Sequence, residues 1–332
     1  MPDDRMAEAM TKALVTGARG FIGAAVCTRL VASGVEVHAV SRISPADAKQ
    51  WWRATAGDIS PAARATVQWW NVDLVEIEAT RNLIRTVRPD TTFHLASLVT
   101  GSRSLEMVLP VFQNNLVSTL NLLVATAECG CGRVVMAGSL EEPDEAEPVP
   151  CSPYAAAKWS AAGYARMFSA LYQLPVVLAR IFMVYGPGQS DHTKLIPYVT
   201  TSLLRGEVPK LSSGVRLVDW TFIDDVVDGL VGCAAVPGID GRTVELGSGE
   251  LVSIREVVEQ LIDLLPSAPH PHFGALPDRP LERVKKADIA QSYELIGWRP
   301  TTPLRVGLAR TVEWYKREIA QHTEAQRMRE GH

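Results

Sequence analysis

The stretch Thr16-Gly17-Ala18-Arg19-Gly20-Phe21-Ile22-Gly23 decides the fold of this chain of 332 residues. An apolar run at residues 13–15 precedes it and is typical of a buried strand, and apolar residues recur at helical spacing over residues 21–32. Glycines between a strand and a helix allow a tight turn, a close approach of a pyrophosphate and close packing of the two elements. The helix N-terminus then offers free N–H groups and a positive dipole end to the phosphates. The sequence therefore predicts a dinucleotide site rather than a plain tight turn, and the expected cofactor contacts here are Gly17, Arg19, Gly20, Phe21, Ile22 and Gly23.

The composition narrows the class of protein. The formal net charge of −4 argues against a nucleic-acid surface, and the 47% of apolar residues are enough for a substantial core. No apolar run is expected to span a membrane, and residues 1–10 resemble neither a signal peptide nor a transit peptide. Five scattered cysteines without a signal peptide favour reduced thiols and a cytoplasmic location. Cys129 and Cys131 lack a second pair of ligands, so no metal site is predicted.

Strand-like and helix-like segments alternate along the chain. Strands are predicted at residues 13–15, 35–40, 66–70, 92–97 and 133–137. Helices are predicted at residues 21–32, 76–87, 105–127, 154–171, 252–265 and 304–319. This alternation predicts an α/β fold in which helices cover both faces of a parallel sheet, the doubly wound arrangement of a Rossmann fold.

The end of the second predicted strand bears on the choice of cofactor. In a dinucleotide-binding fold this end meets the adenosine ribose, where an acidic residue binds the 2′-hydroxyl of NAD and a basic residue accommodates the 2′-phosphate of NADP. This strand ends in Ser41 and Arg42, and the glycine turn adds Arg19. Two guanidinium groups and a hydroxyl suit a phosphate dianion, so we expect NADP(H) in preference to NAD(H), unless both arginines are merely solvated.

Later strand ends add further cofactor contacts. Asp73, at the exit of the third strand, is expected to accept a hydrogen bond from the adenine amino group. The fourth strand runs into Ala96 and Ser97, which are small enough to let the backbone lie close to a cofactor. His94, in the same strand, is expected to be a core histidine rather than a metal ligand, because no second ligand stands at metal spacing.

Ser139, Tyr154 and Lys158 form the predicted catalytic set. Ser139 ends the fifth strand, where ligands gather in open α/β sheets, and Ser152-Pro153 marks the start of the helix that follows. A spacing of four places Tyr154 and Lys158 on one helical face. Because an ammonium group favours a neighbouring phenolate, the pKa of Tyr154 is expected to fall towards neutrality, which suits a general acid or base. The alternative is a tyrosine and a lysine that share a helix surface by chance.

These motifs together resemble the extended short-chain dehydrogenase/reductase family, in its NAD(P)-dependent nucleotide-sugar epimerase, dehydratase and reductase group. The matching pieces lie at residues 16–23, 72–74, 94–96, 139, 154–158, 184–187, 219–225 and 295–300. The resemblance implies a Rossmann domain over residues 11–180 and a smaller, partly interleaved C-terminal α/β domain over residues 181–320 that binds a nucleoside-diphosphate sugar. It further implies cofactor contacts from Leu74, Leu95 and Asn115, and a homodimer formed by the helices that carry Asn115 and Tyr154.

The resemblance also implies substrate contacts, with departures that bear on the activity. Family dehydratases carry Thr-Asp-Glu where this chain has Ser139-Leu140-Glu141, and a leucine cannot transfer a proton, so 4,6-dehydration is not expected. Glu141 is either an acid/base residue or a solvated member of an acidic loop. Arg103 is either a sugar contact or a surface arginine. The residues expected to bind substrate are Thr100, Arg103, Glu141, Met183, Lys194, Leu195, Arg216 and Arg279.

Three functions are compatible with this sequence. The first is an NADPH-dependent reductase of a nucleoside-diphosphate keto-deoxysugar, acting at C4, in which Tyr154 donates the proton, Lys158 holds the ribose and Ser139 orients the carbonyl. The alternative is an epimerase or decarboxylase that oxidises the sugar transiently and keeps NAD bound. The third is a redox-sensing dinucleotide-binding protein, which would have no use for an intact catalytic set.

Overall fold

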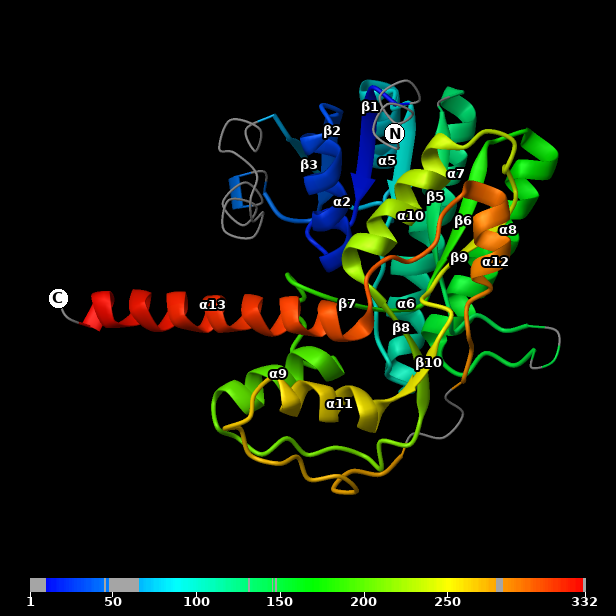
Figure 1. The fold of residues 1–332 in the computed structure, drawn as a ribbon. Coiled ribbons are helices and arrows are strands. Elements are labelled where there is room, and N and C mark those ends of the chain that lie inside the picture. Colours follow the sequence, from blue (N-terminus) through cyan, green and yellow to red (C-terminus); the bar gives the residue numbers. More distant parts are fainter. Residues whose placement is uncertain are drawn as a thin grey trace. The chain divides into compact units, whose positions relative to one another are not determined.

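The computed structural model describes residues 10–44, 46–47, 66–130, 132–144, 146, 148–278 and 283–330, with side chains described as far as residue 321. Its larger sheet has seven strands in the order β3-β2-β1-β4-β5-β6-β9, and every neighbouring pair is parallel (Figure 1). The strands are β1 (Lys12–Thr16), β2 (Glu36–Ser41), β3 (Gln68–Asn71), β4 (Thr91–His94), β5 (Arg133–Ser139), β6 (Val176–Ile181) and β9 (Thr243–Leu246). The strand order reverses between β1 and β4, and open α/β sheets bind ligands beside the carboxyl ends of the strands at such a point. The predicted doubly wound Rossmann fold is confirmed.

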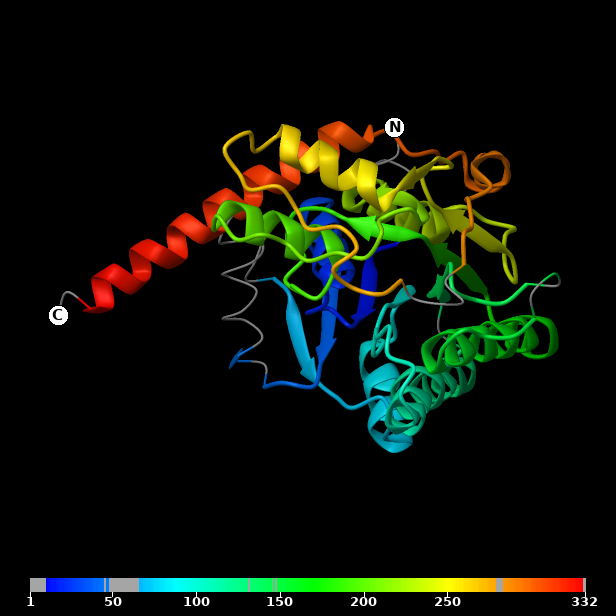
Figure 2. The ribbon, with the colours of Figure 1, turned by 90° about the horizontal axis from the view of Figure 1, so that it is seen from below.

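Helices cover both faces of this sheet. On one face, Ile84 and Leu122 pack against Leu14 of β1, and Ala161 packs against Val134 of β5. Figures 1 and 2 both show α7 and α8 side by side on this face. Because parallel crossovers are right-handed, the connection from β1 to β2 places α2 on the opposite face. The helices that follow the strands are α2 (Phe21–Ala32), α5 (Ile77–Val87), α7 (Ser118–Cys129), α8 (Pro153–Tyr172), α10 (Ile223–Ala235) and α12 (Ile289–Ile296).

The chain divides into two units that each draw on separate stretches of sequence. The first unit combines Met1–Ile181, Val227–Leu246 and Asp288–Arg299. The second unit combines Phe182–Val226, Gly247–Ala287 and Pro300–His332. The chain first crosses between units after Ile181 and returns twice, so β9 and α12 complete the first unit although they follow the boundary expected at residue 180.

A three-stranded sheet of order β10-β8-β7 lies within the second unit. Buried Asp219 fixes the loops around it, because its carboxylate accepts hydrogen bonds from the backbone N–H groups of Ser248 (2.6 Å), Gly249 (3.0 Å) and Ala287 (3.0 Å). The elements of this unit are β7 (Met183–Tyr185), α9 (Leu195–Leu204), β8 (Leu217–Phe222), β10 (Leu251–Ser253), α11 (Ile254–Asp263) and α13 (Leu304–Glu330).

Three predicted helices differ in the structure. The helix expected at residues 304–319 is longer than predicted, since α13 runs from Leu304 to Glu330. The helix expected at residues 252–265 begins only at Ile254, because residues 252 and 253 pair with β8 and Ser253 caps α11. The helix expected at residues 105–127 consists of four pieces: η1 (Leu105–Met107), α6 (Val108–Val111), the π-helical η2 (Phe112–Val117) and α7. Side chains stabilise the widened turn, since the Ser118 and Thr119 hydroxyls donate to the carbonyls of Asn114 and Asn115.

One helical segment of the described chain is long and apolar enough to cross a membrane. It spans Leu105–Cys129. The prediction that no apolar run is long enough to span a membrane is therefore wrong, by the length and composition of this segment alone. Leu122 and Leu123 in this segment are fully buried against the sheet of the first unit. Packing in the core accounts for the apolar residues of α7, because a core helix passes the same test as a membrane span. Leu105, Leu109 and Phe112, in the first half of the segment, are exposed.

Candidate active site

A cavity of about 310 Å³ lies beside the carboxyl ends of β1, β2, β3 and β4. The predicted cofactor residues that line it are Gly17, Arg19, Gly20, Ser41, Arg42, Asp73, Leu74, Ala96 and Ser97. The predicted cofactor residues that do not line it are Phe21, Ile22, Gly23, Leu95, Asn115, Tyr154 and Lys158. The lining residues that sequence reasoning missed are Val40, Ile43, Val72, Val75, Leu98, Asn114 and Ser118. Four strand ends thus meet at one cavity, although they are far apart in the sequence.

The glycine turn has the backbone geometry that a phosphate cradle needs. Gly17 has φ +67°, and a Cβ there would lie 2.7 Å from the backbone nitrogen of Ala96. The Gly20 N–H donates to the Gly17 carbonyl at 2.8 Å, which closes the turn. A Cβ on Gly23 would overlap the same carbonyl, so the helix packs directly on the turn. These residues fit a dinucleotide, whose pyrophosphate would face the N-terminus of α2.

Arg42 and Asn114 are linked at the rim of the cavity. The Arg42 Nη1 donates to Asn114 Oδ1 at 2.7 Å, and Asn114 Nδ2 donates to the Pro110 carbonyl at 2.8 Å. The second bond fixes the orientation of the amide, which in turn holds the guanidinium group beside Ser41. The signal that could have revealed Asn114 is the Asn114-Asn115 pair within an otherwise apolar helical segment.

Buried His94 organises the loop after β4. The Thr119 hydroxyl donates to the Asn115 carbonyl, so it accepts from His94 Nε2 at 2.8 Å. His94 Nδ1 then accepts from the Thr16 hydroxyl at 2.9 Å, and Thr16 Oγ1 accepts from the N–H of Ala96 at 3.1 Å. Burial lowers the pKa of His94 to about 3, with a smaller contribution from the charge of Lys158, so the ring stays neutral.

Asn115 holds the backbone that follows this loop. Its Oδ1 accepts from the Leu98 N–H at 2.6 Å and its Nδ2 donates to the Leu98 carbonyl at 3.1 Å. The residue is buried, and the π-helical turn of η2 directs it towards this segment. Asn115 therefore supports two cavity-lining neighbours, Ser97 and Leu98, through the backbone.

The structure buries Ser139, Tyr154 and Lys158 together at the end of β5 and the start of α8. Ser152 caps α8 by accepting a hydrogen bond from the Ala155 N–H at 3.1 Å. Lys158 Nζ donates to the Ala137 carbonyl at 2.8 Å and lies 5.9 Å from the centre of the Tyr154 ring. The three side chains are therefore held by the sheet and by one helix, and not by a mobile loop.

The pKa of Tyr154 is raised, not lowered as the sequence suggested. Burial is the largest cause, and the charges of Glu141 and Glu142 add to it. The nearby hydroxyls of Ser139 and, more weakly, Ser97 act in the opposite direction. Burial also lowers the pKa of Lys158 to about 8, against the charge of Glu142. The expectation of a lowered tyrosine pKa is wrong here because it weighed the ammonium charge and neglected desolvation.

The predicted substrate residues lie in both units. In the first unit, Thr100 Oγ1 accepts from the Ser102 N–H at 3.1 Å, Arg103 is exposed, and Glu141 accepts from the Ser152 hydroxyl at 3.2 Å. In the second unit, Met183 of β7 pairs with Trp220 of β8. Lys194 precedes Leu195 at the start of α9, and the Arg216 carbonyl accepts from the Ile254 N–H. Arg279 lies outside the described residues. Their contacts with substrate stay predictions.

This fold, with a glycine turn at its cavity and a tyrosine–lysine pair on α8, defines an enzyme of the extended short-chain dehydrogenase/reductase type. Residues 13–247 match the family described as NAD dependent epimerase/dehydratase, and the chain belongs to this family.

Its relatives match along nearly the whole chain. A UDP-glucose 4-epimerase of Mycolicibacterium smegmatis is 31% identical over 320 residues, which cover 92% of this chain and 98% of that protein. A dTDP-glucose 4,6-dehydratase of Neisseria meningitidis serogroup B is 27% identical over 339 residues, with 92% and 93% covered. The structure of MoeE5 in complex with UDP-glucose and NAD has a TM-score of 0.80 and 31% identity, and the match covers 93% of this chain and 99% of that one.

Proposed function

We propose that this protein is an NAD(P)-dependent epimerase of a nucleoside-diphosphate sugar that acts by transient oxidation. The observation that supports this most is the 31% identity to a UDP-glucose 4-epimerase along 92% of the chain. A decarboxylase that acts on the transiently oxidised sugar is the alternative within the same chemistry. Leu140 argues against 4,6-dehydration, because a leucine at that position has no acidic group to protonate a departing hydroxyl. The comparisons thus favour the redox-neutral alternative over the reductase that the sequence first suggested.

Three residues of the first unit have separate roles in this reaction. The nicotinamide, when bound, supplies the acceptor and then the donor of hydride. Tyr154 in its phenolate form accepts the proton of the sugar hydroxyl as its carbon becomes a carbonyl and, now as the phenol, returns the proton in the reverse step. Ser139 donates a hydrogen bond to the same oxygen, and Lys158 holds the ribose of the cofactor and contributes positive charge near Tyr154.

The test is to incubate the purified protein with NAD or NADP and a panel of nucleoside-diphosphate sugars. An epimerase interconverts UDP-glucose, or another sugar of the panel, with its C4 epimer, which proton NMR detects. Nicotinamide absorbance should show no net change, because each hydride removed is returned. Stoichiometric consumption of NADPH with a 4-keto-6-deoxy sugar, without epimerisation, would instead establish the reductase.

The NADP preference also stays a proposal. The family is NAD-dependent, and the matched MoeE5 structure contains NAD. In this chain β2 ends without an acidic residue, and Ser41, Arg42 and Arg19 line the cavity there. These residues support a 2′-phosphate and favour the reductase as the second candidate function, because net reduction uses a dissociable NADPH.

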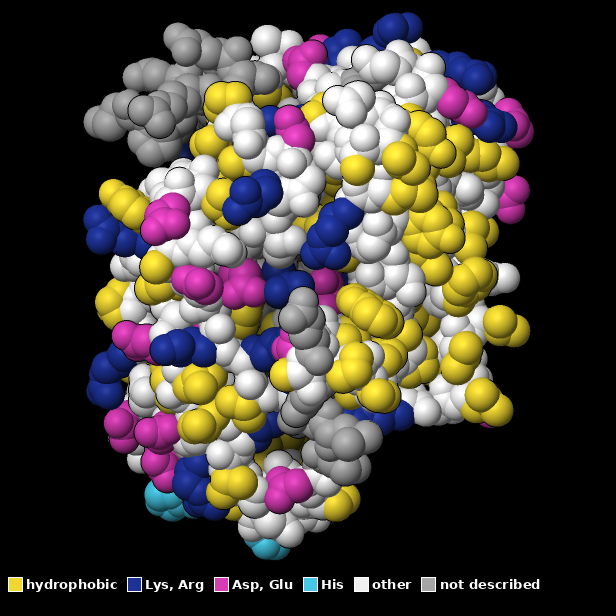
Figure 3. All heavy atoms as spheres, turned by 90° about the vertical axis from the view of Figure 1, so that its right-hand side faces the viewer, with side chains coloured by type: hydrophobic (Ala, Val, Ile, Leu, Met, Phe, Trp, Pro, Cys, Tyr) yellow, Lys and Arg dark blue, Asp and Glu magenta, His cyan; other side chains and the backbone are white. Residues whose placement is uncertain are grey.

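We propose that two copies associate through α8 and the segment before α7. Figure 3 shows hydrophobic side chains gathered over the part of the surface where α7 and α8 lie. Exposed apolar residues of these elements include Leu105, Leu109, Phe112, Trp159 and Tyr164. A contiguous apolar surface of this kind is typical of a protein interface.

A cytoplasmic location is proposed from the thiols. Cys27, Cys129, Cys151 and Cys233 are free cysteines in the described part of the chain. Burial raises the pKa of Cys233 to about 12, so this thiol is inert. Fractionation of the source cells tests the location.

A further inference from the structure

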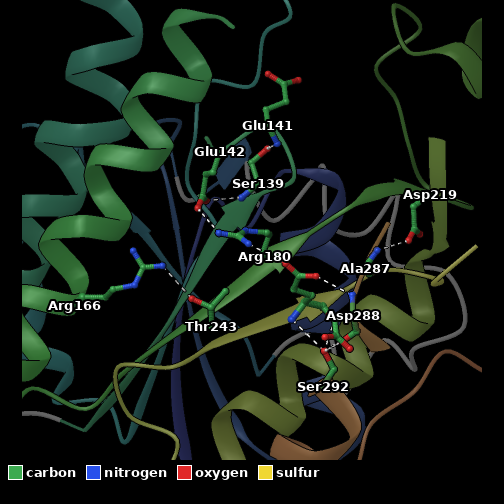
Figure 4. Close-up of polar contacts among 11 residues, drawn as sticks. Ser139, Glu141, Glu142, Arg166, Arg180, Asp219, Thr243, Ala287, Asp288 and Ser292 are labelled. Carbon is green, nitrogen blue, oxygen red and sulfur yellow. Dashed lines mark hydrogen bonds and ion pairs between the residues drawn. The ribbon is translucent and has the colours of Figure 1, made fainter. Parts of the chain in front are cut away.

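Glu142 is a buried carboxylate beside the catalytic serine that the proposed reaction does not use. Its Oε1 accepts from the Ser139 N–H at 2.8 Å, and its own N–H donates to the Ser139 carbonyl at 3.1 Å. Both polar groups of the Ser139 backbone are thus tied to one residue, three positions later in the chain. In Figure 4 the Glu142 carboxylate lies between Ser139 and Arg180, whereas Glu141 points away from them.

The carboxylate fits this place because the residue before Ser139 is a glycine. A Cβ on Gly138 would lie 2.7 Å from Glu142 Oε1 and at 3.4 Å or more from its other neighbours. Gly138 does not have positive φ, so the backbone itself would accept an alanine. The absent side chain therefore makes room for the carboxylate.

An ion pair with Arg180 fixes Glu142 from the other side. Arg180 Nη2 lies 3.4 Å from Glu142 Oε2, and Arg180 Nη1 donates to Glu245 Oε1 at 2.8 Å. Glu245 Oε2 in turn accepts from the Asp288 N–H at 2.8 Å. In Figure 4 a dashed line joins Glu142, in the loop after β5, to Arg180 of β6. Because buried charges are stable only when paired, Arg180 stabilises and orients the Glu142 carboxylate.

We propose that Glu142 is a positioning residue that sets the Ser139 hydroxyl for catalysis, with Arg180 and Glu245 as its support. A hydroxyl that must meet a developing oxyanion tolerates little displacement, and a shift of about 1 Å can cost on the order of a hundredfold in rate. Glu141, its neighbour, donates a hydrogen bond of 3.2 Å from its N–H to the serine hydroxyl. The inference rests on the proposed function, since it assigns Ser139 a part in turnover.

The test uses two variants that disturb the contact and one that keeps it. Glu142→Asp shortens the side chain, and Gly138→Ala displaces the carboxylate without changing it. Each should lower kcat by about 10- to 100-fold, with KM and the cofactor dissociation constant changed by less than about threefold. Glu142→Gln keeps an oxygen that can accept from Ser139, so it should retain kcat within about fivefold. Glu128→Gln, which breaks an exposed ion pair with Arg81, is the matched control and should change nothing.

A double-mutant cycle separates positioning from general damage. In a Ser139→Ala background, Gly138→Ala should lower kcat by less than about threefold, because the hydroxyl that Glu142 positions is already gone. Hydrogen exchange of the Ser139 amide should speed up in Glu142→Asp and Gly138→Ala and stay slow in Glu142→Gln. Equal losses of kcat in both backgrounds, or unchanged kcat in Gly138→Ala, would overturn the inference alone. Absence of turnover in the wild type would overturn the proposed function and the role of Glu142 with it.

Discussion

Lys158 and Tyr154 show what burial does to single ionisable residues. Both lie where water is excluded, and each is displaced towards its neutral form: the pKa of Lys158 falls to about 8 and the pKa of Tyr154 rises. Desolvation is the largest cause of the shift for both groups. Lys158 therefore costs the protein stability at neutral pH, whereas Tyr154 is neutral there in both the folded and the unfolded chain.

The destabilisation caused by Lys158 should be visible in the pH dependence of the free energy of unfolding. Its pKa in the folded protein is about 8 against an ordinary 10.5, so the unfolded chain binds more protons between these values. The penalty is therefore fully present below pH 8 and is relieved as the pH rises to 10.5, by on the order of 3 kcal/mol. Lys158→Met should remove this dependence. Urea unfolding measures the free energy of unfolding of both proteins from pH 7 to 10.5. The wild type should gain stability relative to Lys158→Met over this range, and a difference in free energy that stays constant with pH would contradict the prediction.

Loss of the Tyr154 hydroxyl should abolish proton transfer and leave the fold intact. The ring of Tyr154→Phe still packs among its buried neighbours, so the melting temperature and cofactor binding should be nearly unchanged. Loss of a positioned acid or base typically costs about 100- to 10,000-fold in rate. Ser139→Ala removes one hydrogen bond to the oxyanion and should cost about tenfold to a thousandfold. Steady-state kinetics measures both, and near wild-type turnover by Tyr154→Phe would refute the mechanism.

Arg42 should decide how well the protein distinguishes NADPH from NADH. A charged hydrogen bond to the 2′-phosphate contributes about 1.5–3 kcal/mol, so Arg42→Ala should weaken NADPH binding by roughly ten- to a hundredfold. NADH lacks that phosphate and should bind nearly as before. Fluorescence titration with both cofactors measures this, with the exposed Arg85→Ala as control. An equal loss for both cofactors would instead assign Arg42 to the Asn114 contact alone.

Helix caps determine where two of the elements begin. Ser152 caps the N-terminus of α8 and so fixes the position of Tyr154, which lies two residues later. Ser253 and Glu256 form a capping box that starts α11 directly after β10. Each cap satisfies N–H groups that the first helical turn leaves without partners. An abrupt start lets a helix follow a strand without a connecting loop.

Removal of the Ser253 cap should therefore lower stability without affecting catalysis. Ser253→Ala leaves the N-terminal N–H groups of α11 short of an acceptor and should cost about 1 kcal/mol, within the range of 0.5–2 kcal/mol for such caps. Ser253→Asp keeps a capping oxygen and serves as control. Urea denaturation measures the difference, and a change below about 0.3 kcal/mol for Ser253→Ala would show that the box is not stabilising.

The surface of the whole protein carries apolar side chains that a single copy leaves exposed. Trp159, which is 45% exposed, lies on α8 with buried Tyr154. Leu109, which is 68% exposed, lies on α6, directly before the η2 turn that carries buried Asn115. An interface on this face would stiffen the helix that carries the catalytic tyrosine. Burial of such residues between two copies would also remove their cost in water.

We therefore expect a dimer at micromolar concentration that charged substitutions dissociate. Trp159→Asp combined with Leu109→Asp places two carboxylates in the proposed interface and should give monomers. Light scattering after gel filtration measures the mass of each protein. Val215→Asp, an exposed apolar residue of the second unit, is the matched control and should leave the mass unchanged. A wild type that is monomeric throughout would refute the interface.

The sequence by itself determined the local features of this protein. The period of its apolar residues predicted residues 21–32 as a helix, and α2 has these bounds. The glycine turn and the spacing of Tyr154 and Lys158 identified the family, because turn chemistry and helical geometry act over a few residues. Only the tertiary structure decided which of two adjacent glutamates is buried against Ser139, and in which direction the pKa of Tyr154 moves. Those outcomes depend on atoms from β4, β5, β6 and α8 that come together in folding, and desolvation is a property of that assembled surrounding.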